Sequence, residues 1–508
     1  MIPVPGFEGR RVAVFGLGRS GITAARALKA GGAVPILWDD GVSGRMQAEA
    51  EGFAVEDLTT ADWSGFVALI LSPGAPLTHP KPHWTVDKAK AANVPVLGDI
   101  ELFARALAAI PAAARPRVVA ITGTNGKSTT TALIGWVLKQ AGLTVHIGGN
   151  IGIGVLALPA PTPDAVYVIE VSSYQLDLTT SFAPDVAILT NISPDHLDRH
   201  GGMEGYVAAK ARLFQSPGPD TVALVGVDEV WGRGIAEALA ASGHDGAVIS
   251  SSVHPRESGD PVLSFASTAQ DSGWASSSLS VRPQDRVPAC AGMSGNLEAN
   301  GRVLLANAQP VADLTPARSL PGRHNAQNAA FAWAAARALG VPHETAVEGL
   351  MTFPGLAHRM ETVGQLAGQT DQSGTVKFVN DSKATNADAA RQALMSYPTS
   401  FWIAGGRAKD GGIAELSDLF PRITRAYLIG EAAGDFAGTL GETPHVIAHD
   451  MATAVALAAA DAVAAGGDQV VLLSPACASF DQFPDFEVRG EAFRAAVLNL
   501  GATPSRHG

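Results

Sequence analysis

The chain has 508 residues, and at roughly 150 residues per domain this length predicts two to four domains. Hydrophobic residues make up 46% and charged residues 17% of the chain, which excludes disorder over most of its length. The 36 Lys and Arg residues against 48 Asp and Glu residues leave a net charge of -12, which argues against broad electrostatic binding to nucleic acid or to an anionic membrane.

The first predicted element in chain order is an apolar strand at 11–15. The Gly-rich segment Gly16–Gly21 follows it, and then come a helix that ends near Ala30 and a second strand that ends at Asp39. A strand, a helix and a second strand in this order predict a βαβ unit in a parallel sheet.

A second α/β unit begins at Arg117, where an apolar strand leads into 122–129 and then into a helix that ends near Ala141. A third unit begins after Gly355. The predicted fold class is α/β with three consecutive domains: Rossmann-like, P-loop-type ATPase and again Rossmann-like. The expected domain ranges are 1–112, 113–354 and 355–508. Further strands are expected at 67–71, 118–121, 165–171, 186–190, 376–379, 401–404, 427–429 and 469–473.

The segment at about 250–294 is Ser-rich and has the period of neither a strand nor a helix. It is predicted to be a mobile surface insertion in the central domain, and the alternative is a loop with weak local signals. The amino-acid sequence at 253–260 resembles a translated palindromic DNA repeat, which would make the insertion functionally neutral.

The strongest functional signal is the segment 123–129 between a predicted strand and a predicted helix. Small residues let backbone N–H groups surround a polyphosphate, Lys127 can meet its terminal oxygens, and the Ser128 hydroxyl can bind Mg²⁺. Ile121 stands where the common P-loop has its first glycine. The alternative is a Gly-rich turn with an incidental lysine. The residues expected to contact ATP or GTP are Gly123, Thr124, Asn125, Gly126, Lys127, Ser128 and Thr129.

The segment Gly16–Gly21 matches the G-x-G-x-x-G pattern of dinucleotide-binding loops, and Asp39 lies at the end of the next strand. A carboxylate at that place can bind a ribose or a base. The motif alone is weak, and it leaves three alternatives open: NAD, another nucleotide-linked ligand, or a structural tight turn.

Three further residues are interpreted together with the phosphate loop. Glu170 ends a predicted strand and His196 lies in a loop, and each alone fits a solvated side chain. Because Mg²⁺ on ATP needs oxygen ligands and a second cation often shares the phosphates, together they are favoured as metal ligands. Lys210 lies on a predicted helix, and taken alone it is typical of a surface lysine.

In their order along the chain, these motifs resemble those of the Mur ligase family, whose members form amide bonds of the peptidoglycan stem peptide with ATP. The resemblance covers the chain from residue 10 to about residue 495, apart from the Ser-rich insertion. The ends of the chain resemble the members that add D-glutamate; other Mur-type or folylpolyglutamate-type ligases are the alternative. The matching segments lie at 122–129, 148–152, 170–175, 195–199, 321–328, 355–359, 381–386 and 474–483.

The resemblance implies a role for each matching residue, with UDP rather than NAD in the first domain. The UDP-linked substrate would contact Gly18, Arg19, Ser20, Asp39, Ser72, Pro73, Gly74 and Asn150. ATP would contact, besides 123–129, Asn325, Asn328, Arg359 and Asp381. D-Glutamate would contact Lys383, Thr385, Lys409, Ser479, Phe480 and Phe486. Two Mg²⁺ ions would be bound through Ser128, Glu170, His196 and Lys210, the last carbamylated by CO₂. The catalytic group would comprise Lys127, Asn150, His196, Lys210, Arg359 and Lys383.

The implied reaction passes through an acyl phosphate and releases ADP and phosphate. The expected partners are the small molecules UDP-N-acetylmuramoyl-L-alanine, D-glutamate and ATP, with no nucleic acid, and the expected state is a monomer. Arg407 departs from the family pattern, since some members carry an acid there. An alternative of another class is a non-catalytic nucleotide sensor or an NAD-binding module.

Cysteine usage and hydropathy predict a cytoplasmic protein. Cys290 and Cys477 cannot form a disulfide framework, and no Cys/His spacing suggests a zinc site. The N-terminus lacks the charged-then-apolar order of a secretory signal. No apolar run reaches the ~18 residues of a membrane span, and the Ala-rich stretch 452–465 is expected to be a packed helix.

Overall fold

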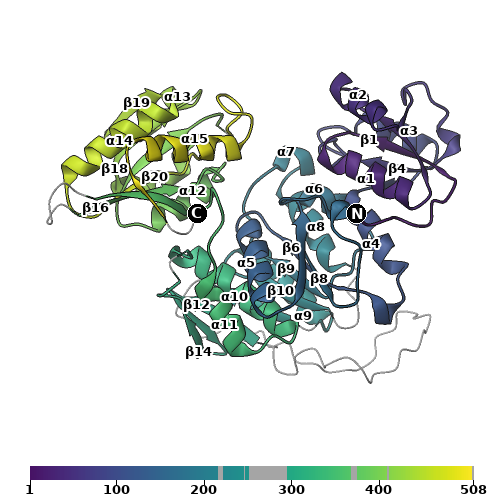
Figure 1. The fold of residues 1–508 in the computed structure, drawn as a ribbon, viewed down its shortest axis with the longest axis horizontal. Coiled ribbons are helices and arrows are strands. Elements are labelled where there is room, and N and C mark those ends of the chain that lie inside the picture. Colours follow the sequence, from purple (N-terminus) through teal and green to yellow (C-terminus); the bar gives the residue numbers. More distant parts are fainter. Residues whose placement is uncertain are drawn as a thin grey trace. The chain divides into compact units, whose positions relative to one another are not determined.

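The computed structural model describes residues 1–215, 221–244, 246–250, 295–317, 319–367, 374–408 and 411–505. The chain folds around three sheets of mostly parallel strands, which confirms the predicted α/β class with three consecutive α/β parts (Figure 1). It forms two compact units. The first comprises 1–300, 304–312 and 327–350, and the second comprises 301–303, 313–326 and 351–508. The insertion predicted at about 250–294 lies outside the described residues, apart from Ser250.

The first sheet is fully parallel and has the strand order β3-β2-β1-β4-β5. The predicted βαβ unit is present as β1 (Arg11–Phe15), α1 (Arg19–Ala30) and β2 (Val34–Trp38). Because β2 and β4 (Phe66–Leu71) flank β1 on opposite sides, the strand order reverses at β1. A reversal of this kind opens a crevice at the carboxyl ends of the strands.

The second sheet has nine strands, and its centre carries the phosphate loop. Strand β6 (Arg117–Thr122) lies between β8 (Ala165–Glu170) and β9 (Val186–Leu189), parallel to both. Four residues separate the end of β6 from the start of helix α5 (Lys127–Gln140), as expected. All six residues of β8 are buried, since helices cover both faces of a parallel sheet of this kind.

The far half of this second sheet was not predicted from the sequence. Its strands are β10 (Val222–Gly226), β11 (Gly246–Ser250), β12 (Gly295–Asn300), β13 (Val303–Ala306) and β14 (Gln309–Asp313). The helices that bear on the site are α4 (Asp99–Ala108), α6 (Ser173–Asp177), α7 (Leu197–His200), α8 (Met203–Ala211) and α10 (Gly322–Ala338).

The third sheet has seven strands in the order β19-β18-β17-β20-β16-β15-β21. The four predicted strands are confirmed as β16 (Thr375–Asn380), β17 (Ser400–Gly405), β18 (Ile423–Ile429) and β20 (Gln469–Leu473). Strand β15 (Glu361–Ala367) was not predicted and runs antiparallel to β16.

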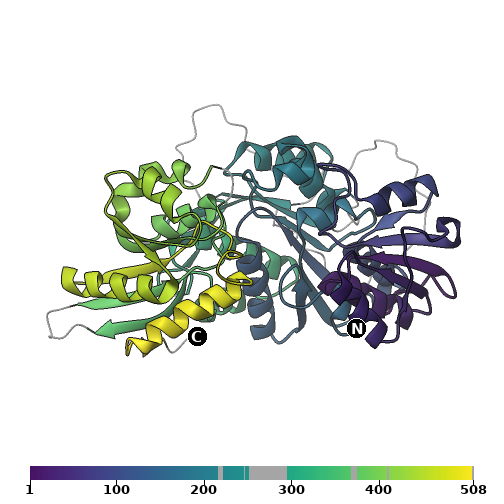
Figure 2. The same cartoon turned by 90° about the horizontal axis from the view of Figure 1, so that it is seen from above.

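Two long helices pack side by side against the third sheet, α14 (Met451–Ala465) and α15 (Phe486–Asn499) (Figures 1 and 2). The Ala-rich stretch is thus a packed helix, as predicted, and Ala454, Val455 and Ala458 on its inner face are fully buried. Among the described helices, none combines the length and the apolar character that crossing a bilayer requires.

Candidate active site

The phosphate loop takes a backbone path that only glycine allows at two positions. Gly123 has a φ of +143°, and a Cβ there would lie 1.9 Å from Thr190 Oγ1. Gly126 has a φ of +81°, and a Cβ there would lie 2.6 Å from Asn328 Oδ1. Lys127 Nζ donates to the carbonyl oxygens of Gly123 at 2.9 Å and Thr124 at 2.7 Å, so the loop surrounds the lysine ammonium.

The residues after β9 hold this loop in place. Asn191 accepts hydrogen bonds from Thr124 N (2.9 Å, at its backbone oxygen) and Asn125 N (2.8 Å, at Oδ1). Thr190 Oγ1 donates to the Asn125 carbonyl oxygen at 2.7 Å. Sequence reasoning did not assign Thr190 and Asn191, although the polar residues that follow an apolar strand were a usable signal.

Glu170 lies at the carboxyl end of β8, beside the phosphate loop in the sheet. Its side chain is buried, and its Oε1 accepts a hydrogen bond from Asn150 Nδ2 at 2.8 Å. Its Oε2 is buried and has no hydrogen-bond partner among the described residues. A buried carboxylate oxygen without a donor is costly, and a divalent cation would satisfy it. The structure thus brings two predicted residues, Asn150 and Glu170, into contact.

Lys210 is almost fully buried on α8, which excludes the surface alternative. Its Nζ donates to the Gly123 carbonyl oxygen at 2.7 Å and lies 4.4 Å from the ring centroid of Tyr206. Burial, followed by the positive charge of Lys127, lowers the pKa of Lys210 well below its usual value. Tyr206 was not predicted, and its hydroxyl contacts Thr124 Oγ1 at 3.1 Å.

The other two predicted metal ligands differ in exposure. Ser128 is buried in the first turn of α5, whereas the side chain of His196 is 42% exposed and its Nε2 lies 3.5 Å from Asp195 Oδ2. Within the described ranges no three His, Cys, Asp or Glu side chains form a metal cage. A cation here would therefore take part of its ligands from phosphate and water, which is usual for Mg²⁺.

Asn325 and Asn328 lie one turn apart on α10. Asn328 Oδ1 accepts a hydrogen bond from Thr130 Oγ1 at 3.2 Å, which places its side chain against the phosphate loop. Asn325 Nδ2 donates to the carbonyl oxygen of Pro321, the residue before α10, at 2.8 Å.

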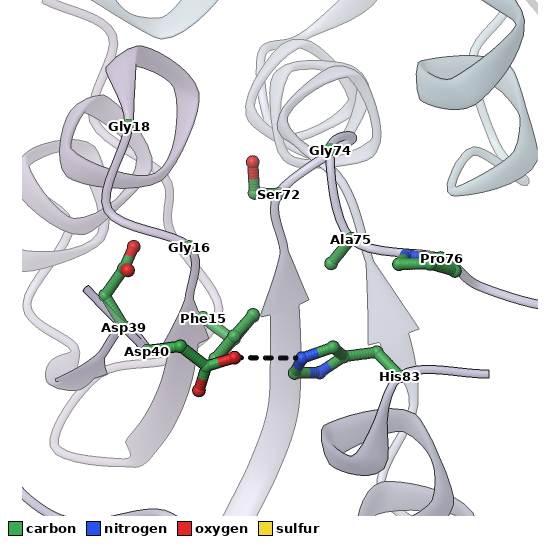
Figure 3. A pocket seen from close by; sticks show the side chains of 10 residues that line it. All are labelled: Phe15, Gly16, Gly18, Asp39, Asp40, Ser72, Gly74, Ala75, Pro76 and His83. Carbon is green, nitrogen blue, oxygen red and sulfur yellow. Dashed lines mark hydrogen bonds and ion pairs between the residues drawn. The ribbon is translucent and has the colours of Figure 1, made fainter.

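A cavity of about 380 Å³ opens at the carboxyl ends of β1 and β4, at the reversal of strand order (Figure 3). Four predicted substrate residues line it: Gly18, Asp39, Ser72 and Gly74. The tight turn is required here, since Gly16 has a φ of +85° and a Cβ there would lie 2.5 Å from Ser72 Cβ. The lining residues that sequence reasoning missed are Phe15, Asp40, Ala75, Pro76 and His83.

Three other predicted substrate residues make contacts away from this lining. Arg19 Nη1 donates to the Gly152 carbonyl oxygen at 2.8 Å, and the Pro73 carbonyl oxygen accepts from Arg199 Nη2 at 3.4 Å. The Ser20 hydroxyl lies near the Asp99 carboxylate, whose pKa it lowers against the larger, opposite effect of burial.

Asp99 connects this glycine loop to the second sheet. The carboxylate of this buried residue accepts hydrogen bonds from Gln175 Nε2 at 3.0 Å and 3.2 Å. Gln175 in turn accepts from Ser172 N at 3.0 Å, just after Glu170. Burial raises the pKa of Asp99.

The second compact unit carries the remaining predicted residues. Asp381 is buried and accepts hydrogen bonds from Met360 N at 3.2 Å and Ser474 Oγ at 3.0 Å. Burial raises the pKa of Asp381 to about 7, against the opposing effect of the nearby Arg359 cation. Lys383 Nζ lies 3.8 Å from the ring centroid of Phe486, so two predicted D-glutamate residues meet.

The other residues predicted to bind D-glutamate differ in their surroundings. Thr385 N donates to the Lys383 carbonyl oxygen at 2.8 Å. Ser479 is buried, whereas Phe480 is 64% exposed. Lys409 lies outside the described residues.

Arg407 pairs with Glu431, whose Oε1 lies 3.2 Å from Arg407 Nη2. Its backbone N–H and carbonyl group also exchange hydrogen bonds with Ala478 at 2.9 Å and 3.0 Å.

Known proteins are similar to this chain over almost its full length, and a family model matches its middle part. The description "Mur ligase middle domain" applies to a family model that matches residues 121–278. A UDP-N-acetylmuramoylalanine–D-glutamate ligase from Caulobacter sp. (strain K31) is 58% identical over 502 residues, which cover 99% of this chain and 98% of that protein. The protein of the same name from Nitrobacter hamburgensis is 50% identical over 507 residues, covering 99% and 100%. The chain belongs to the Mur ligase family.

Solved structures agree with the fold of this Mur ligase. The crystal structure of UDP-N-acetylmuramate–alanine ligase MurC from Thermotoga maritima has a TM-score of 0.54 at 14% identity, and it covers 97% of this chain and 99% of its own. That of MurF from Acinetobacter baumannii has a TM-score of 0.51 at 18% identity, covering 96% and 91%. At these identities the likeness concerns the fold alone.

The first unit of this Mur ligase combines two kinds of binding site. The Gly-rich loop, Lys127 and the N-terminus of α5 form an anion-binding site suited to a triphosphate. The unpartnered Glu170 oxygen offers a ligand to a cation beside it. The cavity at β1 and β4 can hold a nucleotide-linked molecule.

Proposed function

We propose that this ligase joins D-glutamate to UDP-N-acetylmuramoyl-L-alanine in peptidoglycan precursor synthesis, with conversion of ATP to ADP and phosphate. The observation that carries this function is the 57–58% identity to Caulobacter ligases of that name over 99% of the chain. Identity of this extent includes both ends, where members of the family that add different amino acids are expected to differ.

The reaction begins with ATP at the loop 123–129. Lys127 would neutralise the terminal phosphates while the substrate carboxylate attacks the γ-phosphorus, forming an acyl phosphate and releasing ADP. The amine of D-glutamate then attacks the acyl carbon, and phosphate leaves from the tetrahedral intermediate. No side-chain nucleophile is needed, because phosphorylation itself activates the carboxylate. Positioning and charge stabilisation supply the catalysis.

Ser128, Glu170, His196 and Lys210 would hold two Mg²⁺ ions. Bound there, Mg²⁺ would supply charge neutralisation on the transferring phosphoryl group. The unpartnered Oε2 of Glu170 supports this assignment. Asn150, which donates to the other oxygen of Glu170, would orient the carboxylate and contact the substrate.

Lys210 would act as a carbamate. The neutral amine attacks CO₂, forms an N–C bond and loses one proton, which gives an anionic oxygen ligand. The lowered pKa of Lys210 supports this step, because only the unprotonated amine is nucleophilic. An ammonium at this place would repel Mg²⁺, whereas the carbamate would attract it.

The second unit would supply the amino-acid site and additional ATP contacts. Lys383 and Phe486, with Thr385, Lys409, Ser479 and Phe480, would bind D-glutamate, and the proximity of Lys383 to Phe486 supports their joint role. Arg359, Asp381 and Asn325 would contact ATP. We expect a monomer that acts in the cytoplasm, with the domains 1–112, 113–354 and 355–508.

The decisive assay measures phosphate release from ATP in the presence of UDP-N-acetylmuramoyl-L-alanine, with and without D-glutamate. Release that depends on D-glutamate, together with the new amide product by mass spectrometry, is the expected result. Turnover with another amino acid but not with D-glutamate would reject the proposal. Tight NAD binding without any phosphate release would favour a nucleotide-binding module instead.

A further inference from the structure

Three side chains of the first unit, Ser173, Asp177 and His200, form a buried polar chain that the proposed reaction does not use. His200 is the last residue of α7, and its side chain is only 2% exposed. Its Nδ1 lies 3.1 Å from Asp177 Oδ2, and its Nε2 lies 3.0 Å from Ser173 Oγ. Because a carboxylate accepts hydrogen bonds, the proton on Nδ1 faces Asp177. Both nitrogens of the ring are thus engaged, and the ring is held in one orientation.

Asp, His and Ser in this order have the arrangement of a hydrolase triad, but burial excludes that role. Ser173 is the first residue of α6 and is 3% exposed. A nucleophile must be able to reach its substrate, which a hydroxyl enclosed in this way cannot do. The polar contacts of His200 therefore have a different consequence, which is to fix what its ring packs against.

The His200 ring packs against two tyrosines. It is stacked on Tyr174, with centroids 5.4 Å apart and an angle of 12° between the planes, and its centroid lies 5.3 Å from that of Tyr206. Tyr206 in turn contacts two parts of the phosphate site. Its ring centroid lies 4.4 Å from Lys210 Nζ, and its hydroxyl lies 3.1 Å from Thr124 Oγ1. His200 thus reaches Lys210 through the ring of Tyr206.

The other tyrosine extends these contacts to His196. The ring centroid of Tyr174 lies 5.0 Å from that of His196 and 4.6 Å from Arg199 Cζ. His196 has a φ of +54°, a left-handed conformation that a residue with a side chain keeps only where its surroundings support it. The stack of His200 on Tyr174 is part of that support.

We propose that Ser173, Asp177 and His200 are positioning residues, which hold Tyr206, and through it the amine of Lys210, in place at the phosphate loop. The further role of this amine as a carbamate that binds Mg²⁺ rests on the proposed function, whereas its positioning is inferred from the contacts among α6, α7 and α8. Without the two polar contacts the His200 ring can turn, and Tyr206 and Lys210 gain freedom. A group that must be in place before a reaction acts more slowly when its position is no longer fixed.

The first measurement does not depend on the proposed function. Reductive methylation with formaldehyde and cyanoborohydride labels the lysines of the full-length protein in CO₂-free buffer without nucleotide, and mass spectrometry gives the rate at each lysine. In His200→Phe, which keeps a ring but loses both polar contacts, Lys210 should be labelled at least about tenfold faster. The exposed Lys139 should be labelled at the same rate in all variants. Ser173→Ala, which removes one polar contact, should accelerate the labelling of Lys210 less.

His343→Phe is the matched control, because it makes the same change at a histidine whose Nδ1 accepts a hydrogen bond from Trp333 Nε1 at 3.2 Å. It should leave the labelling of Lys210 unchanged. Thermal unfolding of each variant measures the stability that it has lost.

The second measurement is the dependence of phosphate release on bicarbonate. In His200→Phe we expect kcat without added bicarbonate to fall at least about tenfold with little change in KM for ATP. Added bicarbonate should restore part of this loss, since it favours the carbamate of a lysine that is less well held. A variant that had only lost stability would not respond to bicarbonate in this way.

Equal labelling of Lys210 in the unaltered protein, His200→Phe and Ser173→Ala would overturn the inference, even in a working ligase that responds to bicarbonate. Faster labelling of Lys210 in both variants, with no effect of bicarbonate on any form of the protein, would support the positioning and contradict only the proposed carbamate. Faster labelling in His343→Phe as well would show that any loss of a buried histidine frees Lys210, which would also overturn the inference.

Discussion

Replacing Glu170 with Gln should stabilise the protein and abolish most of its activity. The substitution keeps the shape of the side chain, and the remaining carbonyl oxygen can still accept the 2.8 Å hydrogen bond from Asn150. It removes a buried charge whose Oε2 has no hydrogen-bond partner among the described residues. Removal of a buried charge of this kind, with one oxygen that accepts no hydrogen bond, is worth about 1–3 kcal/mol of unfolding free energy, partly offset by the lost attraction to the nearby Lys210.

The same substitution removes a ligand of the proposed Mg²⁺ site. Loss of a few kcal/mol of charge stabilisation in the phosphoryl-transfer step corresponds to a fall in kcat of at least about 100-fold. Stability and activity should therefore change in opposite directions, which neither misfolding nor a neutral substitution would produce.

Thermal unfolding without metal and phosphate release with Mg²⁺ and ATP measure the two effects. Without metal, the unfolding temperature of Glu170→Gln should be a few degrees higher than that of the unaltered protein. The additional rise in unfolding temperature when Mg²⁺ and ATP are added should be smaller in the variant than in the unaltered protein. Glu204→Gln, at an exposed glutamate on α8, is the control for the loss of charge. A destabilised variant, or one that keeps full activity, would refute this account of Glu170.

Three other changes test separate parts of the structure. Lys127→Ala should abolish acyl-phosphate formation, measured by trapping the intermediate, and formation at the original rate would contradict the assignment of the phosphate loop. Gly126→Ala should lower the unfolding free energy, measured by chemical denaturation, by about 1–3 kcal/mol more than Gly142→Ala. The two glycines have φ values of +81° and +80°, but only a Cβ at Gly126 would meet a neighbour, Asn328 Oδ1 at 2.6 Å. Equal losses in the two variants would exclude that contact. Burial raises the pKa of Asp381 from 3.8 to about 7, so the stability that its protonated form contributes is complete below pH 3.8 and is lost as the pH rises to about 7. In Asp381→Asn the unfolding free energy should therefore fall less over this pH range. An unchanged slope would show that Asp381 titrates normally.

The parts of the site that sequence reasoning found are those encoded by contiguous residues. The phosphate loop occupies one turn between β6 and α5, so the spacing of its glycines and Lys127 was enough to predict it. The central strands were predicted for the same reason, since each is a short run of apolar residues. The small strands β12 to β14 alternate weakly and carry polar residues, and they were missed.

Residues distant in sequence were predicted less well, because the fold decides which of them meet. Asp40 and His83 are 43 positions apart and face each other because β2 and β4, the strands that precede them, flank β1 on opposite sides. Asp39 follows the pattern of a ligand-binding carboxylate, yet its two oxygens accept hydrogen bonds from backbone N–H groups, one from Leu17 in the glycine loop and one from Gly41. Lys210 was typical of a surface residue by sequence, and its burial against Gly123 depends on the packing of α8.

The buried hydrogen bonds of Asp99 have a consequence for which substrates can react. They join Asp99, whose carboxylate lies near Ser20 in the loop beside the first cavity, to Gln175, shortly after Glu170 on the second sheet, within one compact unit. The separation between the cavity at β1 and the phosphate loop is thus determined when the chain folds. If the first cavity holds the nucleotide of the substrate, as proposed, a molecule with a shorter or longer link between its nucleotide and its carboxylate would bring the wrong atom to the phosphate, and we expect it not to react.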